Sequence, residues 1–274
     1  MIKLIVSDLD GTLLDHHKQV SLREQEQLAK VKEAGLQLCL ASGRNHFEIQ
    51  KILGDIGHQA HSVSQNGAFI HLNDGTFFKS KLFEAELAHR VYQLLHDFDL
   101  VKLVCSIDGN YIAIPTPASD AIEQRMFQPL IIKSDLEHAF MLGLPTSKFS
   151  LFGQLEVLLQ VKAKMEDKLG DQLELFISDK DCLDIMPQHV SKGSSLLVLM
   201  EQLGLKPEEV ACVGDSFNDV SMFGVTPHSF AMHGAHPDVK KRAANQVHSV
   251  SEAIEHVFAV NQQLTLQSKG SSSL

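Results

Sequence analysis

The sequence predicts an α/β protein in which a domain with a parallel sheet is interrupted by an inserted α+β domain. Three observations support this prediction. The N-terminal part alternates short apolar runs with helical stretches, the C-terminal part repeats the alternation, and the middle of the chain has its candidate strands in nearby pairs. Alternating strands and helices are typical of a parallel sheet with helices on its faces. Paired strands joined by turn residues indicate antiparallel hairpins.

The N-terminal part begins with an apolar run that ends at Asp8, as expected of a buried strand. Ser21 and Glu24 have the spacing of a capping box and predict the start of a helix. Gly35 follows as its C-cap, because glycine readily adopts a left-handed backbone. The predicted elements are a strand over 2–7, a helix over 21–34, a strand over 36–41 and a helix over 46–53.

The C-terminal part has the same alternation. Gly204 ends a helical stretch, and Pro207 suits the first turn of a short helix. The tail from Gln262 is polar, and we expect it to be frayed. The predicted elements are a helix over 192–203, strands over 210–214 and 229–232, and helices over 237–244 and 251–260.

The middle of the chain differs from both ends. Turn residues such as Asp108-Gly109-Asn110 separate neighbouring apolar runs, which favours hairpins. The predicted strands cover 100–107, 111–114, 148–152, 173–178 and 182–186, with helices over 84–96 and 156–169. We therefore expect residues 83–186 to form an inserted domain, and 1–82 with 187–274 to form the domain that receives it.

Composition excludes several classes of function. With a formal net charge of −10 and a pI of about 5.8, the chain has no basic stripe to displace counterions, so we expect no nucleic-acid partner. No apolar stretch approaches the ~20 residues of a membrane helix. The start of the chain soon meets acidic residues, unlike a signal peptide, and the expected compartment is the cytoplasm. The four cysteines and fifteen histidines are scattered and do not have the spacing of metal ligands. A monomer and a homodimer both remain open.

Polar residues with suitable chemistry follow three predicted strands. In parallel sheets, ligand sites gather where strands end, so these side chains should converge. Lys192, ahead of a predicted helix, is a candidate fourth contributor. The residues after the three strands are Asp8, Leu9 and Asp10, then Ser42, Gly43 and Arg44, then Asp215, Asn218 and Asp219.

Together these residues predict a binding site for a metal ion beside a binding site for a phosphate group. Asp8, Asp10 and Asp215 would form a cluster of oxygen ligands that repels itself without a cation, and Mg²⁺ is the hard cation that suits it. A hydroxyl from Ser42, backbone donors and the Lys192 ammonium would surround the remaining space. Hydrogen-bond donors and positive charge are what phosphate oxygens require.

The same segments resemble the haloacid dehalogenase (HAD) superfamily of phosphohydrolases. Asp8-Leu9-Asp10-Gly11-Thr12-Leu13 is similar to its first motif. Ser42, Lys192 and Gly214-Asp215-x-x-Asn218-Asp219 resemble the second, third and fourth motifs, in that order. Gln65-Asn66-Gly67-Ala68 and Leu183-Asp184-Ile185-Met186-Pro187 resemble the segments that flank the cap in the Cof-type branch. The resemblance implies a Rossmann-like HAD core with an inserted α+β cap of class IIB.

The resemblance also implies a role for each residue. Asp8 would be the nucleophile that forms an aspartyl-phosphate, and Asp10 the general acid and base. Mg²⁺ would be held by the Asp8 carboxylate, the Asp10 main-chain oxygen and the Asp215 carboxylate. The expected phosphate contacts are Leu9, Ser42, Gly43, Lys192 and Asn218. Asp219 would orient Lys192 or a metal-bound water. Arg44 and Lys148 are candidates for a substrate contact, with a surface, helix-capping or solvated strand position as the alternative.

The function implied is Mg²⁺-dependent hydrolysis of phosphate monoesters of small metabolites, with sugar phosphates or pyridoxal 5′-phosphate as candidate substrates. Two alternatives remain. A phosphomutase would pass the phosphoryl group to a bound sugar, and a non-catalytic sensor would bind a phosphorylated metabolite without turnover. Release of inorganic phosphate separates the first reading from both alternatives.

Overall fold

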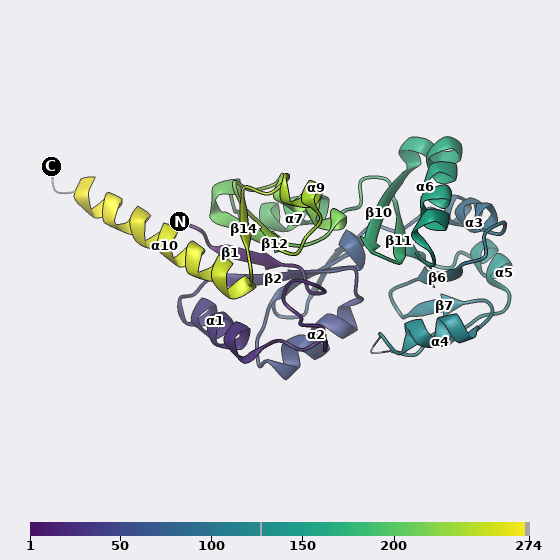
Figure 1. Cartoon of the computed structure of the whole chain (residues 1–274), viewed down its shortest axis with the longest axis horizontal. Coiled ribbons are helices and arrows are strands. Elements are labelled where there is room, and N and C mark those ends of the chain that lie inside the picture. The colour runs from purple at the N-terminus through teal and green to yellow at the C-terminus, as the bar shows by residue number, and fades with distance from the viewer. Residues whose placement is uncertain (127, 272–274) are drawn as a thin grey trace.

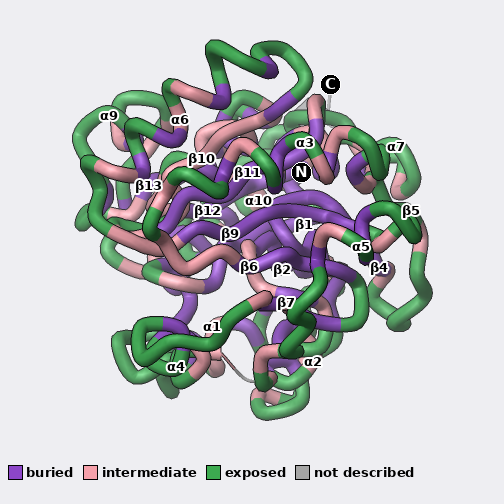
Figure 2. Tube along the Cα trace, turned by 90° about the vertical axis from the view of Figure 1, so that its right-hand side faces the viewer, coloured by how far each residue is buried: buried purple, intermediate pink, exposed green. Residues whose placement is uncertain are grey.

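The computed structural model describes residues 1–126 and 128–271. Its strands form two sheets, one of eight strands and one of six, which lie side by side along the long axis of the molecule (Figure 1). The central strands of both sheets, such as β1 (Leu4–Ser7), β9 (Lys148–Phe152) and β11 (Cys182–Pro187), are largely buried, while many helices turn an exposed side outward (Figure 2). We call the part around the eight-stranded sheet the core and the part around the six-stranded sheet the cap.

The core sheet has β1 near its centre. β1 pairs in parallel with β2 on one side and with β12 on the other, and only the β3–β4 and β4–β5 pairs of this sheet are antiparallel among the described residues. Its order is β14-β13-β12-β1-β2-β3-β4-β5. The strands are β1 (Leu4–Ser7), β2 (Gln37–Ala41), β3 (His61–Ser64), β4 (Phe69–His71), β5 (Phe77–Ser80), β12 (Val210–Gly214), β13 (His228–Met232) and β14 (Asn245–Val247).

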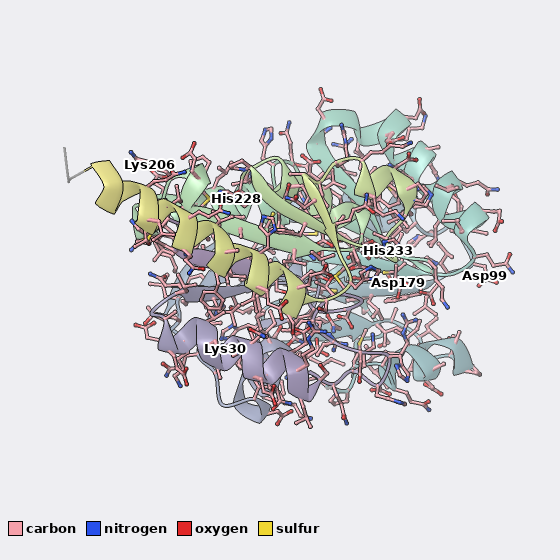
Figure 3. The ribbon with its side chains drawn as sticks, turned by 60° about the vertical axis from the view of Figure 1, so that its left-hand side comes forward. Lys30, Asp99, Asp179, Lys206, His228 and His233 are labelled. Atoms are coloured by element: carbon pink, nitrogen blue, oxygen red, sulfur yellow. The ribbon has the colours of Figure 1, made fainter. Side chains whose placement is uncertain are left out.

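Helices cover both faces of the core sheet. Along β1, Ile5 faces one apolar layer and its neighbours Leu4 and Val6 face the other, because successive side chains of a strand point to opposite faces. The first layer is formed with α1 (Leu22–Glu33), α2 (His46–Asp55) and α10 (Val250–Ser271). The second is formed with α7 (Lys192–Leu203), α8 (Val220–Phe223) and α9 (Pro237–Lys240). Figure 3 shows α10 running along the core above α1.

The cap is a mixed sheet with helices packed on its outer face. Its order is β10-β11-β9-β6-β7-β8, and all its pairs are antiparallel except β7 with β8. The strands are β6 (Val101–Cys105), β7 (Asn110–Ile112), β8 (Ile131–Ile132), β9 (Lys148–Phe152), β10 (Leu173–Asp179) and β11 (Cys182–Pro187). The outer helices are α3 (Ala85–Leu94), α5 (Leu136–Met141) and α6 (Leu155–Leu169), whereas α4 (Pro117–Glu123) packs on the inner face.

The inner face of the cap sheet turns toward the core. Along β9, Phe149 and Leu151 belong to the apolar layer under the outer helices, so Lys148 and Ser150 point the other way. The same alternation on β11 places Asp184 on the inner face, in register with Ser150. The cap therefore presents polar side chains, some of them charged, to the edge of the core at which β1 ends.

The fold class predicted from the sequence is confirmed, and two predicted elements differ from the structure. The tail from Gln262 is not frayed over its described part, because α10 continues to Ser271. The helix predicted over 237–244 ends at Lys240. Residues 272–274 of the predicted tail lie outside the described residues. The exact domain boundaries at 82/83 and 186/187 stay a prediction.

One expected interaction is replaced by another. Ser21 caps α1 by accepting the backbone N–H of Glu24, as predicted. The Glu24 carboxylate, however, accepts the hydroxyl of Ser251 at 2.8 Å, so it ties α1 to α10 instead of closing the capping box. No helix within 1–126 and 128–271 is long and apolar enough to cross a membrane.

Candidate active site

Three parallel strands of the core end at one pocket that the cap covers. Asp8 follows β1, Ser42 follows β2 and Asp215 follows β12, and all three line this pocket. The cap contributes Lys148, Ser150 and Asp184 among others. The site therefore lies between the carboxyl edge of the core sheet and the inner face of the cap sheet, as ligand sites in α/β folds do.

A buried lysine joins two carboxylates at the centre of the site. Lys192 Nζ donates to Asp8 Oδ1 and to Asp219 Oδ1, each at 2.6 Å, and all three side chains are buried. Burial works against the charge of Lys192, but Asp219 and Asp8 outweigh it and raise the pKa of the ammonium. Lys192 is thus a fixed positive charge, and the predicted link between Asp219 and Lys192 is present in the structure.

The nucleophile candidate lies in an acidic cluster. One carboxylate oxygen each from Asp8, Asp215 and Asp219 lies within 4.8 Å of the other two. Burial, together with the charges of Asp219 and Asp215, raises the pKa of Asp8 well above its usual range. Burial, with the charge of Asp219 next, raises the pKa of Asp215 to about 6. A cation would relieve this repulsion, and a set of carboxylate oxygens fits Mg²⁺.

The three acidic residues are not equivalent. Asp219 Oδ1 already accepts Lys192, and its Oδ2 accepts the backbone N–H groups of Asp215 and Ser216 at 2.9 and 3.0 Å. Its carboxylate is therefore committed to holding the loop after β12. Asp8 and Asp215 remain the side chains that fit a metal, and their role as ligands, with that of Asp10, stays a prediction.

Glycine at position 11 is a steric requirement of this loop. Gly11 has a φ of +81°, and a Cβ there would lie 2.5 Å from Asp215 Oδ2. Thr12, the next residue, donates its hydroxyl to Asp215 Oδ1 at 3.1 Å. The Asp8-Leu9-Asp10-Gly11-Thr12 segment thus positions Asp215, a role for Thr12 that sequence reasoning missed although the motif contains it. Leu9 is buried, and its carbonyl accepts the N–H of Leu14 at 2.8 Å.

The side chain of Asp10 is held by two cations. Arg44 donates from Nε to Oδ2 at 2.7 Å and from Nη2 to Oδ1 at 2.9 Å, and Lys18 Nζ contacts Oδ1 at 2.7 Å. Burial alone would raise the pKa of Asp10, but these two cations lower it to about 2. Arg44 also bonds Glu48 at 3.3 Å, so it links α2 to Asp10. Lys18 was not expected, because no sequence pattern brings its loop to the site.

The remaining predicted residues surround the pocket on both sides. Ser42 is buried, and its hydroxyl accepts the N–H of Arg44 at 3.2 Å. Lys148, from the cap, donates to the carbonyl of Gly43 at 3.0 Å. Asn218 Nδ2 donates to Asn66 Oδ1 at 3.1 Å, and its own Oδ1 is buried with no partner among the described residues. The structure therefore brings together every predicted site residue, while their chemical roles stay predictions.

Two further residues were missed as site residues. Asn66 and Asp184 are joined at 2.6 Å across the boundary between core and cap. Both were noted only as parts of the segments flanking the cap. A sequence signal existed for Asp184, because an acidic residue within an apolar strand needs a partner, but that partner could not be named.

Comparison with known proteins identifies the class. A family model described as haloacid dehalogenase-like hydrolase matches residues 5–258. A haloacid dehalogenase-like hydrolase from Bacteroides thetaiotaomicron is 28% identical and superposes with a TM-score of 0.79 over 94% of this chain and 100% of its own. One from B. subtilis, at 24% identity, shares the fold with a TM-score of 0.85 over 93% and 99%. The chain belongs to the haloacid dehalogenase-like hydrolase family.

Curated relatives give a finer indication. The HMP-PP phosphatase of Escherichia coli O157:H7 is 29% identical over 262 residues, which cover 93% of this chain and 94% of the relative. The HMP-PP phosphatase of Escherichia fergusonii is 28% identical over 265 residues, with the same coverage. The predicted family and the predicted class of enzyme, a phosphatase-type hydrolase, are confirmed.

Proposed function

We propose that this protein hydrolyses phosphate monoesters of small metabolites by way of an aspartyl-phosphate on Asp8, with Mg²⁺ as cofactor. One observation carries the proposal: a buried carboxylate, Asp8, is held by a lysine at 2.6 Å within a cluster of carboxylates that also contains Asp215 and Asp219. A structural ion pair would need only one acid for one base. The surplus negative charge is what a site for a metal cation requires, and such a cation can also bind a phosphate group.

The first step forms a bond between an Asp8 oxygen and phosphorus while the bond to the leaving alcohol breaks. Lys192 would bind a phosphoryl oxygen and stabilise the charge that develops there. Mg²⁺ held by the Asp8 and Asp215 carboxylates and the Asp10 main-chain oxygen would neutralise part of the negative charge at the site. Asp10 would give a proton to the leaving alkoxide and then take one from the water that cleaves the aspartyl-phosphate, which returns Asp8 to its carboxylate form.

Asp10 must change partners to do this work. A carboxylate with a pKa of about 2 carries almost no proton near neutral pH, so it cannot act as an acid while Arg44 and Lys18 both hold it. We propose that substrate phosphate draws one or both of these cations away. The pKa of Asp10 would then rise as the substrate enters, which links its protonation to an occupied pocket.

The substrate is a small phosphorylated metabolite. The named relatives act on HMP-PP, and sugar phosphates and pyridoxal 5′-phosphate remain candidates from the sequence. The proposed compartment is the cytoplasm, and monomer and homodimer remain alternatives. A panel containing these compounds, scored by release of inorganic phosphate with Mg²⁺, would rank them and would separate a phosphatase from a phosphomutase.

Asp8→Asn tests the proposed nucleophile. The amide cannot form the aspartyl-phosphate, so phosphate release from p-nitrophenyl phosphate should fall by at least ~10³-fold, in the range expected for loss of a covalent catalyst. The thermal midpoint should stay close to that of the wild type. EDTA should abolish phosphate release by the wild-type enzyme, and added Mg²⁺ should restore it.

The matched control is Asp55→Asn, the same chemical change at an exposed residue at the end of α2. It should keep full activity. Substantial turnover by the Asp8→Asn variant would remove Asp8 as the nucleophile, and a wild type that binds phosphate esters without releasing phosphate would favour the sensor.

A further inference from the structure

A buried carboxylate of the cap reaches into the phosphate site of the core. Asp184, on the inner face of β11, is 2% exposed. Its Oδ1 accepts the Ser150 hydroxyl at 2.6 Å and Lys148 Nζ at 3.1 Å, both from the neighbouring strand β9. Its Oδ2 crosses to the core and accepts Asn66 Nδ2 at 2.6 Å. Each oxygen of the carboxylate therefore has a defined donor.

The charge of Asp184 makes it an acceptor only. Burial opposes the charge of Lys148, but Asp184, together with Cys105 and Cys182, outweighs it and raises the pKa of this lysine. Lys148 and Asp184 form an ion pair. An ionised carboxylate has no proton to donate. It therefore fixes the orientation of the Asn66 amide, with Nδ2 toward the cap and Oδ1 toward the core.

The orientation of the Asn66 amide determines the orientation of the Asn218 amide in the phosphate site. Asn66 Oδ1 accepts Asn218 Nδ2 at 3.1 Å, so the N–H side of the Asn218 amide is set in turn. If the Asn66 amide were flipped, its Nδ2 would face Asn218 in place of its Oδ1. The Asn218 amide would then be favoured in the flipped orientation too, with its Oδ1 where its Nδ2 now lies. A phosphate oxygen needs a donor, and an amide oxygen in its place would repel it.

The same pair reaches the turn after β2. Lys148 Nζ donates to the carbonyl of Gly43 at 3.0 Å. Gly43 is tightly enclosed, because a Cβ there would lie 3.3 Å from Asn66 Oδ1 and 3.7 Å from Lys148 Nζ. The Asp184–Lys148 pair thus touches two separate parts of the phosphate site, the Ser42-Gly43 turn and, through Asn66, the Asn218 amide.

We infer that Asp184 is a positioning residue that completes the phosphate site only when the cap lies over the core. This inference rests on the proposed phosphatase function. Two of the hydrogen bonds that cross the boundary, from Lys148 to Gly43 and from Asn66 to Asp184, are lost if the cap moves away. Gly43 then loses its contact with Lys148, and Asn66 loses the acceptor that orients its amide toward Asn218. Phosphoryl transfer is thereby confined to the state in which the cap excludes bulk water.

Asp184→Asn is the first test. The variant keeps the shape of the side chain but removes both the charge and the fixed orientation of Asn66. We expect kcat for a substrate accepted by the wild type to fall ~10–100-fold, the usual effect of losing a partner that orients a directly acting group. KM should change by less than ~3-fold, since Asp184 touches no substrate in this scheme. Mg²⁺ affinity, followed by thermal shift, should be unchanged.

The decisive variant exchanges the two groups. Asn66→Asp combined with Asp184→Asn moves the carboxylate across the boundary, so residue 66 again offers an acceptor to Asn218. The amide at 184 can donate to residue 66 and accept from Lys148 and Ser150. This double variant should recover at least ~5-fold of the kcat lost in Asp184→Asn, because coupled neighbours are not additive. Asn66→Asp alone should be the least active, since it opposes two carboxylates.

Asp171→Asn, an exposed acid of the cap, is the matched control and should behave as wild type. A kcat unchanged in Asp184→Asn overturns the inference. So does a double variant that is no more active than Asp184→Asn, whether or not either is less stable than the wild type. Neither result touches the proposed function, which would fail only if the wild type released no phosphate or if Asp8→Asn kept its activity.

Discussion

The side chain of Lys192 is fully enclosed, and its ammonium lies 2.6 Å from a carboxylate oxygen of Asp8 and 2.6 Å from one of Asp219. Two acids around one base leave a surplus of negative charge, which a metal would neutralise. Burial makes each partner costly to leave unpaired. The nucleophile candidate is therefore held in place by the same contact that stabilises the core.

Lys192→Met should be strongly destabilising. It leaves Asp8 and Asp219 buried without their cation, which costs about 3–5 kcal/mol of unfolding free energy when one partner of a buried pair is removed. Activity should be lost as well. Denaturant unfolding measures the change, with Lys32→Met on the exposed side of α1 as control. A loss below about 1 kcal/mol would contradict the view that this lysine stabilises the core.

At the scale of elements, the N-terminus of α7 can pack closely against α8 because residue 193 is a glycine and has no side chain. A Cβ on Gly193 would lie 2.1 Å from the carbonyl oxygen of Ser221 and 2.4 Å from its carbon. Because both atoms belong to the backbone, neither can swing aside. The close approach keeps Lys192, the preceding residue, directed at Asp8.

Gly193→Ala should therefore shift the start of α7 and lower both activity and stability. A forced backbone shift in a packed region costs about 1–3 kcal/mol. The control is Gly54→Ala in α2, where, among the described residues, no atom beyond the adjacent backbone of the helix lies within 4 Å of the added Cβ. That change should stabilise the protein by about 0.4–1 kcal/mol, since alanine restricts the unfolded chain. Equal thermal midpoints for the two variants would refute the packing argument.

Elements with strong local signals could be predicted from the sequence, and short ones could not. Helix α7 begins at Lys192 and ends at Leu203 as predicted, because Ser191 caps one end and Gly204, with a left-handed backbone, the other. Helices α4 and α5 were missed, since six or seven residues are too few to show an apolar period. The antiparallel edge formed by β4 and β5 was also missed, because Phe77–Ser80 is mostly exposed and shows little apolar alternation.

The candidate site divides in the same way. Residues that follow strands, such as Asp8 and Asp215, could be predicted because the carboxyl edge of a parallel sheet gathers them. Asp184 could not, because its partners Ser150 and Lys148 lie 34 and 36 residues away and meet it only through the register of β9 and β11. Lys18 reaches Asp10 from an irregular loop, which leaves no periodic signal.

On the scale of the whole molecule, core and cap are joined by a small apolar cluster and by several polar contacts. Gln65 Nε2 donates to the carbonyl of Ser106 at 2.8 Å, and Ser216 Oγ donates to that of Ser178 at 3.3 Å. Contacts of this kind are individually worth about 0.5–1.5 kcal/mol. Such a boundary can separate and re-form without unfolding either sheet, as cap motion requires.

Metal binding should couple global stability to pH. Without metal, folded Asp215 keeps its proton up to about pH 6, whereas the unfolded chain releases it near 3.8, so stability falls as pH rises through this window. Mg²⁺ binds the deprotonated form, so its stabilising effect should grow over the same window. Thermal midpoints with Mg²⁺ and with EDTA should differ more at about pH 7.5 than at about pH 5.

The control for this experiment is Asp215→Asn, which should show little response to Mg²⁺ at either pH. A wild-type response of equal size at both pH values would show that deprotonation of Asp215 does not govern the metal's effect.

The position of β1 between β2 and β12 has a consequence for biosynthesis. The chain leaves the ribosome N-terminus first, yet Leu4 pairs with Val210 and Ile2 exchanges two hydrogen bonds with Asn261, at 2.6 and 2.9 Å. β1 therefore cannot complete its pairing in the sheet until the last quarter of the chain has been made. Every strand of the cap lies between Val101 and Pro187, so the cap can fold while the rest is still being made. We expect the cap to fold before the core sheet during synthesis, and therefore before the active site at the edge of that sheet is formed.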